Sequence, residues 1–202
     1  GTAQDVLAYK VPSASRWGGI SGYETTLVGN GEQGDIFVDP DDPNIVFSMS
    51  GGSPMGGGAP FTRNNLKTGQ NEVRNILPEP IFGLDASEMQ YRFQWDTPFL
   101  ISKYDSDTIY SAGNVMFKST DEGLTWEVIS DDLTRDLKDK QVITGTPWLP
   151  EYFGQEIYST INRLAESPLQ EGVLWAGSDD GLIHLTKDGG DSWENVTIPN
   201  LP

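Results

Sequence analysis

The sequence reads Ser119-Thr120-Asp121-Glu122-Gly123-Leu124-Thr125-Trp126 and, further on, Thr186-Lys187-Asp188-Gly189-Gly190-Asp191-Ser192-Trp193. Both octapeptides fit the pattern Ser/Thr-x-Asp-x-Gly-x-x-Trp, and their tryptophans are 67 residues apart (193 minus 126). An Asp followed two positions later by Gly suits a tight turn, because Asp bonds to nearby backbone N–H groups and Gly accepts a positive φ. The hydroxyl residue ties the turn from its other side, and the Trp returns to cover the base of the hairpin. Each octapeptide therefore predicts a β-hairpin.

The octapeptides belong to a longer repeat. Upstream of them, β-rich segments with a central turn occupy residues 36–47, 99–110 and 164–175. Spaced by 63 and 65 residues, the closing aromatic residues of these segments are Phe47, Tyr110 and Trp175. Similarity at a long fixed period indicates a repeat architecture, with about four short strands in each unit. In the earliest unit the octapeptide has decayed to residues 62–69, which offer a turn but lack the Asp, Gly and Trp in register.

The octapeptide pattern resembles the Asp-box, the hairpin signature of BNR-repeat β-propellers. That group includes sialidases, xyloglucanase-like glycoside hydrolases and sortilin-like receptors. Residues 91–98 and 129–134 are similarly reminiscent of the large sortilin-like or glycosyl-hydrolase-related propeller proteins of bacteria. The resemblance implies an all-β fold, a β-propeller with about three four-stranded blades that form part of a larger closed propeller. It also implies a structural role for Ser119, Asp121, Gly123, Trp126, Thr186, Asp188, Gly190 and Trp193.

The repeats divide the chain into four parts of one propeller domain. These are a leader or partial blade (1–31), a blade with the degenerate octapeptide (32–94), a blade with an octapeptide and an insert (95–154) and a last octapeptide blade (155–202). A propeller closes with about four to eight blades, and three alone would leave unpaired sheet edges. We therefore expect further blades as partners, either from a longer form of the same protein or from another chain. The best helix candidate is the short segment 83–90.

The composition argues against several functions. A net charge of −17 and a pI near 4.2 disfavour binding to nucleic acid or anionic lipid. The chain has no cysteine, so it forms neither disulfides nor thiolate metal sites. No apolar run approaches the roughly 18–20 residues of a membrane-spanning helix, so we expect no membrane insertion.

The acidic residues are scattered through turns such as 39–43 and 130–132, which lack the spacing of an EF-hand. We expect a solvated acidic surface without a metal or cofactor, and calcium held by clustered carboxylates is the alternative. By resemblance to Asp-box proteins, which are mostly exported, we place the protein in the periplasm, on the cell surface or outside the cell of a bacterium.

Asp179 and Asp180 are the candidate catalytic residues. The hairpin that contains them runs 11 residues from Trp175 to Thr186, against 9 residues from Tyr110 to Ser119, so the two acids can occupy a longer tip. In the xyloglucanase-like enzymes a catalytic Asp lies in a Thr-Asp-x-Gly-Gly turn, and the sequence Gly-Ser-Asp-Asp-Gly departs from that pattern. Asp-Asp-Gly is also a good hairpin turn without any chemistry. A glycosidase needs two carboxylates flanking one glycosidic bond, so the hydrolytic and the structural interpretations both stay open here.

Other catalytic arrangements lack their residues. The only histidine, His184, lies in a strand with apolar neighbours, where a structural role is expected. The arginine triad and the Arg-Ile-Pro motif of the catalytic sialidases are not recognisable in the chain. These observations favour a function without chemistry.

Trp17 and Trp148 are the candidate ligand-binding residues. Each lies beside turn residues and outside the octapeptides, and flat rings on loops suit sugar stacking or protein contacts. The alternative is that such rings fill gaps between blades, which we expect for Trp95 because a repeat strand follows it directly. Two hypotheses result: a binding or scaffold propeller that recognises glycan or protein ligands through its loops, and a part of a polysaccharide-degrading glycoside hydrolase.

Overall fold

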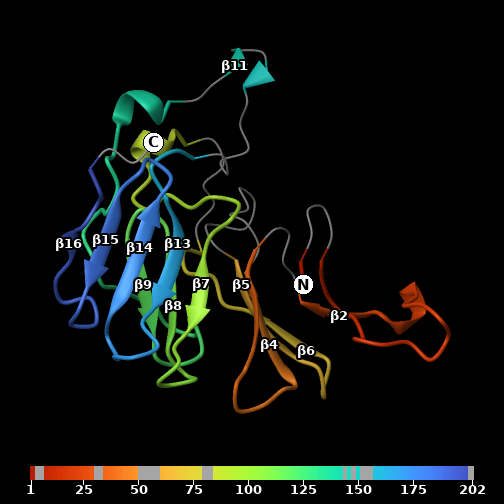
Figure 1. Ribbon diagram of the computed structural model, residues 1–202. Helices are drawn as coiled ribbons and strands as arrows, with labels where there is room; N and C mark the ends of the chain where they lie inside the picture. The colour runs from red at the N-terminus through yellow and green to blue at the C-terminus, as the bar shows by residue number, and fades with distance from the viewer. Residues whose placement is uncertain are drawn as a thin grey trace.

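The computed structural model describes residues 1–2, 7–29, 34–49, 60–78, 84–142 and 157–199, and only the backbone of residues 145–146 and 149–150. These residues form three four-stranded antiparallel sheets whose strand order follows the sequence (Figure 1). We call them the first, second and third blade. The first blade consists of β3 (Ile36–Val38), β4 (Ile45–Met49), β5 (Phe61–Asn65) and β6 (Gln70–Val73). The second consists of β7 (Phe99–Ile101), β8 (Ile109–Ala112), β9 (Met116–Ser119) and β10 (Glu127–Val128). The third consists of β13 (Ile161–Glu166), β14 (Leu174–Ser178), β15 (Ile183–Thr186) and β16 (Glu194–Asn195).

The predicted all-β fold class is confirmed, and each blade lies inside one of the three predicted repeat ranges, whose boundaries remain predictions. Two smaller sheets pair β1 (Ala8–Lys10) with β2 (Thr26–Gly29), and β11 (Gly145–Thr146) with β12 (Leu149–Pro150). The described helical residues are confined to the 3-10 turns η1 (Gly22–Glu24), η2 (Ala86–Glu88) and η3 (Lys138–Lys140). The helix candidate at 83–90 therefore contains one short turn at η2.

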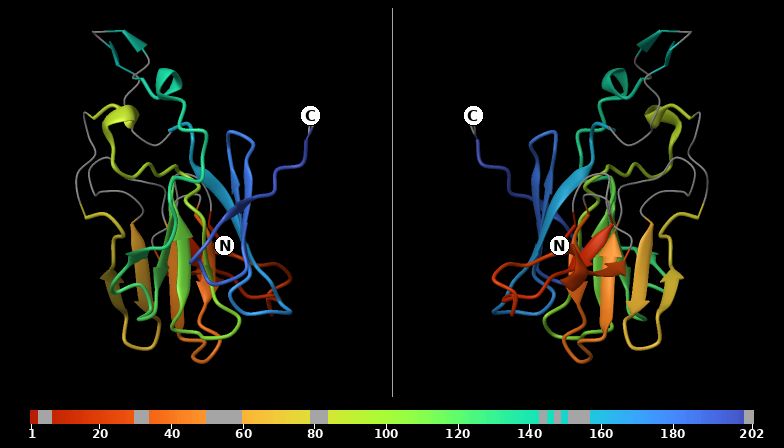
Figure 2. Two further views of the ribbon diagram at one scale, coloured as in Figure 1. Left: turned by 90° about the vertical axis from the view of Figure 1, so that its left-hand side faces the viewer. Right: turned by 90° about the vertical axis from the view of Figure 1, so that its right-hand side faces the viewer.

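The blades stack face to face in chain order, as adjacent propeller blades do (Figures 1 and 2). Phe47 and Phe61 of the first blade pack against Phe99 and Phe117 of the second. Burying a Phe side chain completely contributes about 1.5–3 kcal/mol, so a few such rings dominate the packing between two blades. A second cluster joins the other face of the second blade to the third blade through Tyr110, Met116, Leu174 and Ala176.

The closing aromatic residues show which faces are covered. Phe47 and Tyr110 point toward the following blade, and Trp175 lies on the corresponding face of the third blade. Phe47 is 0% exposed and Tyr110 4% exposed, because the following blade covers each of them, whereas Trp175 is 43% exposed. The opposite face of the first blade is covered by the small β1–β2 sheet, since Ala8 and Val28 pack against Val46.

The two octapeptides form equivalent turns. The Ser119 hydroxyl accepts a hydrogen bond from Gly123 N at 2.8 Å, and the Thr186 hydroxyl accepts one from Gly190 N at 3.0 Å. The Asp121 carboxylate accepts from Thr125 N at 2.8 Å, and the Asp188 carboxylate accepts from Ser192 N at 3.0 Å. Gly123 and Gly190 have φ values of 82° and 110°, which explains why both positions require glycine. The turn chemistry expected from the sequence is therefore present in both places.

The predicted register of the degenerate octapeptide was wrong by two residues. Strand pairing sets Arg63 opposite Glu72, as it sets Lys118 opposite Glu127, so the residue equivalent to Ser119 is Asn64 and not Thr62. In this register Leu66, Thr68 and Asn71 replace the Asp, Gly and Trp. The hairpin is closed instead by the Asn65 side chain, which accepts hydrogen bonds from the backbone N–H groups of Lys67 and Thr68.

The octapeptide tryptophans attach the second and third blades to the blade before them. Trp126 of the second blade packs edge-on against Phe61 of the first, with ring centroids 5.7 Å apart. Trp193 of the third blade donates its indole N–H to the Ile129 carbonyl of the second at 2.8 Å. The Trp therefore covers a neighbouring blade as well as its own hairpin.

Asp188 generates a prediction about acid stability. Hydrogen bonds from the hydroxyls of Ser192 and Thr186 lower the pKa of Asp188 from 3.8 to about 2. A carboxylate with a depressed folded-state pKa stabilises the fold above its unfolded pKa, and this contribution is lost as the pH falls through the folded pKa. Between about pH 4 and about pH 2, the melting temperature of an Asp188→Asn variant should therefore fall less steeply than that of the parent, as measured by circular dichroism.

Asp191→Asn is the matched control for this experiment. The Asp191 carboxylate accepts no hydrogen bond from the residues that the structure describes, so this variant should keep the slope of the parent. Identical slopes for the parent and Asp188→Asn would show that the turn does not stabilise the ionised carboxylate.

Candidate functional site

Asp179 and Asp180 lie in the hairpin between β14 and β15, at the end of the third blade opposite its octapeptide. One carboxylate oxygen of Asp179 accepts hydrogen bonds from the backbone N–H groups of Ser159 and Thr160, both at 3.0 Å. The other oxygen accepts from the Gln94 amide at 3.1 Å. Asp179 thus fastens the chain that enters β13 and the chain that enters β7 to the same hairpin.

Asp180 is buried and holds a different connection. One of its carboxylate oxygens accepts from the Ser178 hydroxyl at 2.5 Å, and the other accepts from Arg135 N at 2.7 Å. Arg135 also donates its Nε to the Asp180 backbone carbonyl at 2.8 Å. The longer hairpin tip expected from the sequence is therefore used to tie the connection after β10 to the third blade.

The two acids are adjacent, and their environment favours protonation of Asp179. Burial raises the pKa of Asp179 above its ordinary value, hydrogen bonds from the Thr160 and Ser159 backbone lower it, and the neighbouring charge of Asp180 raises it further. A raised pKa is a property of a general acid. The hydrogen bonds that both carboxylates already accept leave them few free lone pairs for a substrate.

A buried arginine, which the sequence analysis did not single out, organises the same end of the blades. Arg92 is 1% exposed and forms ion pairs with Asp132 at 2.7 Å and Asp136 at 3.0 Å. Its Nε also donates to the Ser159 carbonyl at 3.1 Å. Removing one partner of a buried ion pair costs about 3–5 kcal/mol, so Arg92 is a structural centre for these loops. The one feature of the sequence that could have indicated burial of Arg92 is its position between two aromatic residues, Tyr91 and Phe93.

Trp17 lies on an exposed loop between β1 and β2. It is 85% exposed, and Tyr23 on the same loop is fully exposed. The Glu24 carboxylate holds the loop together, because it accepts hydrogen bonds from the Ser15 hydroxyl at 2.9 Å and from Ser21 N at 3.1 Å. The ring is therefore exposed on a loop that these hydrogen bonds hold together, and it fills no gap between the three described blades. The other predicted ligand-binding residue, Trp148, lies outside the described residues.

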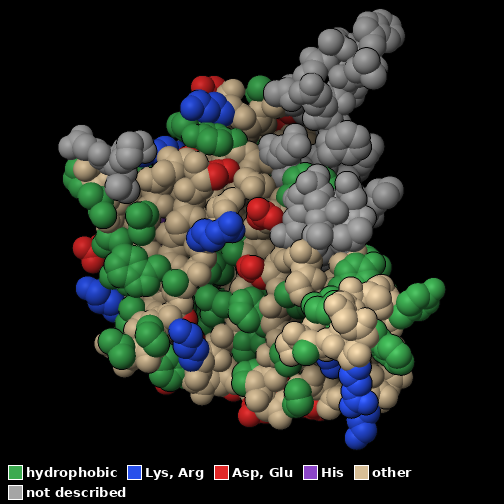
Figure 3. Space-filling view, turned by 45° about the vertical axis from the view of Figure 1, so that its right-hand side comes forward, with side chains coloured by type: hydrophobic (Ala, Val, Ile, Leu, Met, Phe, Trp, Pro, Cys, Tyr) green, Lys and Arg blue, Asp and Glu red, His purple; other side chains and the backbone are tan. Residues whose placement is uncertain are grey.

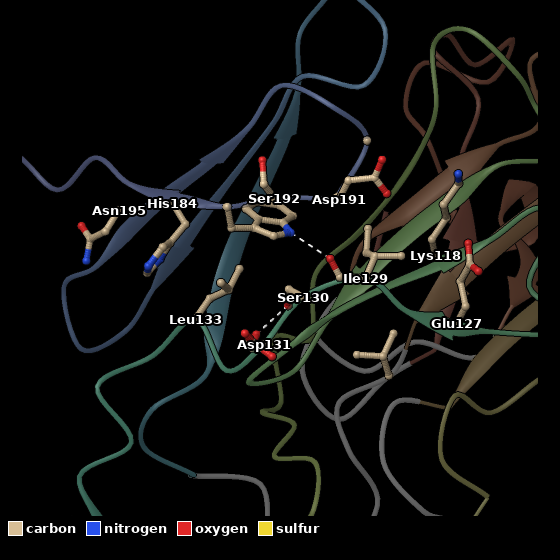
Figure 4. Close-up of a pocket in the computed structure, with 14 residues that line it drawn as sticks. Lys118, Glu127, Ile129, Ser130, Asp131, Leu133, His184, Asp191, Ser192 and Asn195 are labelled. Carbon is tan, nitrogen blue, oxygen red and sulfur yellow. Dashed lines mark hydrogen bonds between the residues drawn. The ribbon is translucent and has the colours of Figure 1, made fainter.

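An open polar groove of about 740 Å³ runs between β10 and the third blade. Figure 4 shows Lys118, Glu127 and Ile129 on one side, and His184 and Asn195 on the other. Trp193 and Asp191 of the octapeptide turn also line it. Its volume falls in the range of about 300–1,000 Å³ of small-molecule sites, but its lining is mostly polar, whereas most such sites are mostly apolar.

His184 lies in β15, in the apolar strand that the sequence predicted, and its side chain faces the groove. Burial lowers the pKa of His184, and the Asp180 charge opposes this effect. Its buried Nδ1 has no hydrogen-bond partner in the described part of the chain. The neutral imidazole is the form that this environment favours.

A second carboxylate pair, Asp35 and Asp96, lines a small cavity of about 110 Å³ with Thr97 and Arg163. Burial raises the pKa of Asp35, whereas a hydrogen bond from the Phe99 backbone and the charge of Arg163 lower it. The cavity lies well below the volume range of ligand sites, about 300–1,000 Å³, so it has no room for a polysaccharide.

The described surface shows no concentrated charge on the face in Figure 3, where acidic and basic side chains are scattered among hydrophobic ones. Within the described ranges, no three acidic or histidine side chains gather in an arrangement that could hold a metal ion. The described helices are also too short to cross a membrane.

Comparisons with known proteins assign no family. No protein-family model matches the chain, and no curated protein matches it. Among solved structures it is similar to the GH74 enzyme of Niastella koreensis, with 15% identity, a TM-score of 0.49 and coverage of 89% of this chain and 20% of that chain. An ancestral GH74 enzyme has 14% identity and a TM-score of 0.48, and the match covers 85% of this chain and 18% of that chain. YCF48 from Cyanidioschyzon merolae has 20% identity and a TM-score of 0.43, and the match covers 83% of this chain and 43% of that chain. The chain thus spans about a fifth of the length of the two GH74 enzymes.

The hydrogen bonds of Asp179 generate a stability prediction. An Asp179→Ala substitution leaves the buried N–H groups of Ser159 and Thr160 without their acceptor, and it should destabilise the fold by about 1–3 kcal/mol in urea unfolding. Asp179→Asn keeps one oxygen acceptor and should cost less. Equal stability of Asp179→Ala and the parent would show that the carboxylate does not hold this loop.

Proposed function

We propose that this chain is a binding segment of a larger β-propeller, which recognises glycan or protein ligands through its loops and catalyses no reaction by itself. The observation that carries the proposal is the display of Trp17 and Tyr23 on a loop fixed by Glu24. Ile20, on the same loop, is also exposed. Large rings that are held in place but left in solvent offer contact area with little loss of conformational entropy on binding.

The proposal against catalysis is supported by the hydrogen bonds of the two candidate acids. The Asp179 carboxylate accepts hydrogen bonds from four groups of Gln94, Ser159 and Thr160, and the Asp180 carboxylate accepts one from Arg135 N, so both acids hold separate segments together. An acid–base pair in a glycosidase instead faces one bond of the substrate, with the carboxyl groups about 5–5.5 Å apart for retention or about 6.5–9.5 Å for inversion.

Glycoside hydrolysis is the second candidate function, and one observation favours it. The pKa of Asp179 is raised by burial and by Asp180, which suits a general acid. In that case a second carboxylate must come from elsewhere in a larger protein. We favour ligand binding over a xyloglucanase-like reaction at Asp179 or Asp180. The hydrogen bonds that these two carboxylates accept from the loops already give both acids a role in the fold.

Three further proposals complete the functional assignment. The two octapeptides are Asp-boxes, which is supported by their equivalent hydroxyl, carboxylate and glycine contacts. The protein acts in the periplasm, at the cell surface or outside the cell, as the resemblance to exported Asp-box proteins implies. The face that carries Trp175 is covered by a further blade of the same protein or of another chain, as the equivalent faces at Phe47 and Tyr110 are covered here.

A binding and turnover assay tests the main proposal. On glycan and peptide arrays the parent should bind at least one ligand. A Trp17→Ala/Tyr23→Ala variant should bind that ligand with a signal about tenfold lower. Its melting temperature should be unchanged, because both side chains are exposed. With β-glucan or xyloglucan as substrate, the parent should release no reducing ends. Turnover that disappears in an Asp179→Asn variant of unchanged melting temperature would favour the hydrolase instead.

The proposed covering of Trp175 predicts association. In sedimentation velocity, the 22.2 kDa chain should not behave as a monodisperse monomer, because a half-exposed tryptophan face promotes contact between copies. A Trp175→Lys variant should shift the distribution toward monomer. A monodisperse parent monomer would show that this face needs no covering blade.

A further inference from the structure

The seam between the first and second blades is sealed by charged side chains. Glu122 projects from the octapeptide turn of the second blade, and its carboxylate accepts hydrogen bonds from Arg63 of the first blade at 2.7 and 3.1 Å. Arg74, also of the first blade, donates to the Glu122 backbone carbonyl at 2.7 Å and approaches its carboxylate at 3.6 Å. Three long side chains therefore fill this position.

The same position is open at the next seam. Lys118 and Ile129 of the second blade are equivalent to Arg63 and Arg74 by strand pairing, and Gly189 of the third blade is equivalent to Glu122. Glu122 and Gly189 both have positive φ, 57° and 76°, and their backbone N–H groups bond equivalent carbonyls of Asp107 and Gly172. Because Gly189 has no side chain, Lys118 has no charged partner among the described residues, and the groove of about 740 Å³ lies where the first seam holds its ion pairs.

The groove contains polar groups without partners beside a fixed aromatic ring. Among the described residues, no hydrogen bond or ion pair involves the charged groups of Lys118, Glu127, Asp131 and Asp191, which all line the groove (Figure 4). Trp193 is held in one orientation by its bond to the Ile129 carbonyl, so its partly exposed ring is a preformed wall.

The charge of the groove selects the chemistry of a ligand. Three carboxylates against one ammonium group disfavour phosphates and other anions. A cation would use the carboxylates but not the Lys118 ammonium group or the Asn195 Nδ2 group, which only donate hydrogen bonds, and Asn195 Oδ1 already accepts one from Thr197 N. Sugar hydroxyl groups both donate and accept, and the apolar face of a sugar ring can lie against an indole, so a neutral saccharide can use all of these groups.

We propose that the groove between β10 and the third blade binds a neutral oligosaccharide, with Trp193 as the apolar wall and Lys118, Glu127, Asp131, Asp191 and Asn195 as hydrogen-bond partners. This site is separate from the Trp17 loop. Its existence does not depend on whether that loop binds a ligand.

The most direct test introduces, between the second and third blades, the ion pair that fills the equivalent position between the first and second blades. Gly189→Glu places a carboxylate where Glu122 lies at the other seam, beside Lys118, and a Cβ at this position meets no atom within 4 Å. Gly69→Glu is the matched control, because Gly69 has the same φ of 76° and equally open space, on the first blade.

The protein is titrated with neutral gluco-, xylo-, manno- and galacto-oligosaccharides by calorimetry and tryptophan fluorescence. At least one should bind, and Gly189→Glu should weaken its binding at least about tenfold while Gly69→Glu leaves it unchanged. Asp191→Ala, an exposed change without a hydrogen bond to lose in the described part of the chain, should weaken the same ligand and decides the matter where Gly189→Glu does not fold.

Three outcomes would overturn the proposal. One is the absence of binding by any of the neutral oligosaccharides. Another is parent-like affinity in the folded Gly189→Glu and Asp191→Ala variants. The third is binding of oligolysine in the groove in place of the saccharides, which would identify it as a site for basic peptides.

Discussion

The octapeptide turn is the constraint on which the rest of the structure depends. Its hydroxyl and carboxylate oxygens accept backbone hydrogen bonds inside the loop, and a glycine at positive φ allows the chain to reverse. This fixed loop aims an indole at the preceding blade, where Trp126 meets Phe61 and Trp193 meets the Ile129 carbonyl. The hydrophobic faces that dominate the stability of the stack are held in register by a polar turn at their edge.

Much of this architecture could be predicted from the sequence, because a long-period repeat shows itself in residues that have one role in every copy. Phe47, Tyr110 and Trp175 mark the same place on three strands, and the octapeptides mark the same hairpin twice. The decayed copy was harder, since Asn64 carries neither the hydroxyl nor a following Asp. Only strand pairing reveals its register.

The candidate site was less predictable, because it depends on contacts between distant segments. Asp179 was recognisable as a tip residue, but its bonds to Gln94 and to the Ser159 backbone bridge parts of the chain far apart in sequence. Arg92 resembles any surface cation until its burial beside Asp132 is known. The groove was hidden for another reason: it arises at a variable position of the octapeptide, where the pattern itself places no requirement.

The backward reach of the tryptophans also gives the stack a direction of assembly. A newly completed hairpin carries the indole, and its contact surface belongs to a blade that has already left the ribosome. Synthesis proceeds from the N-terminus, so the docking surface of each later blade has already been made when the turn of that blade closes. The β1–β2 sheet precedes the first blade in the sequence and packs on Val46 of that blade, so it follows the same chain order. During synthesis, the aromatic face of the most recently formed blade is then the one that stays in solvent.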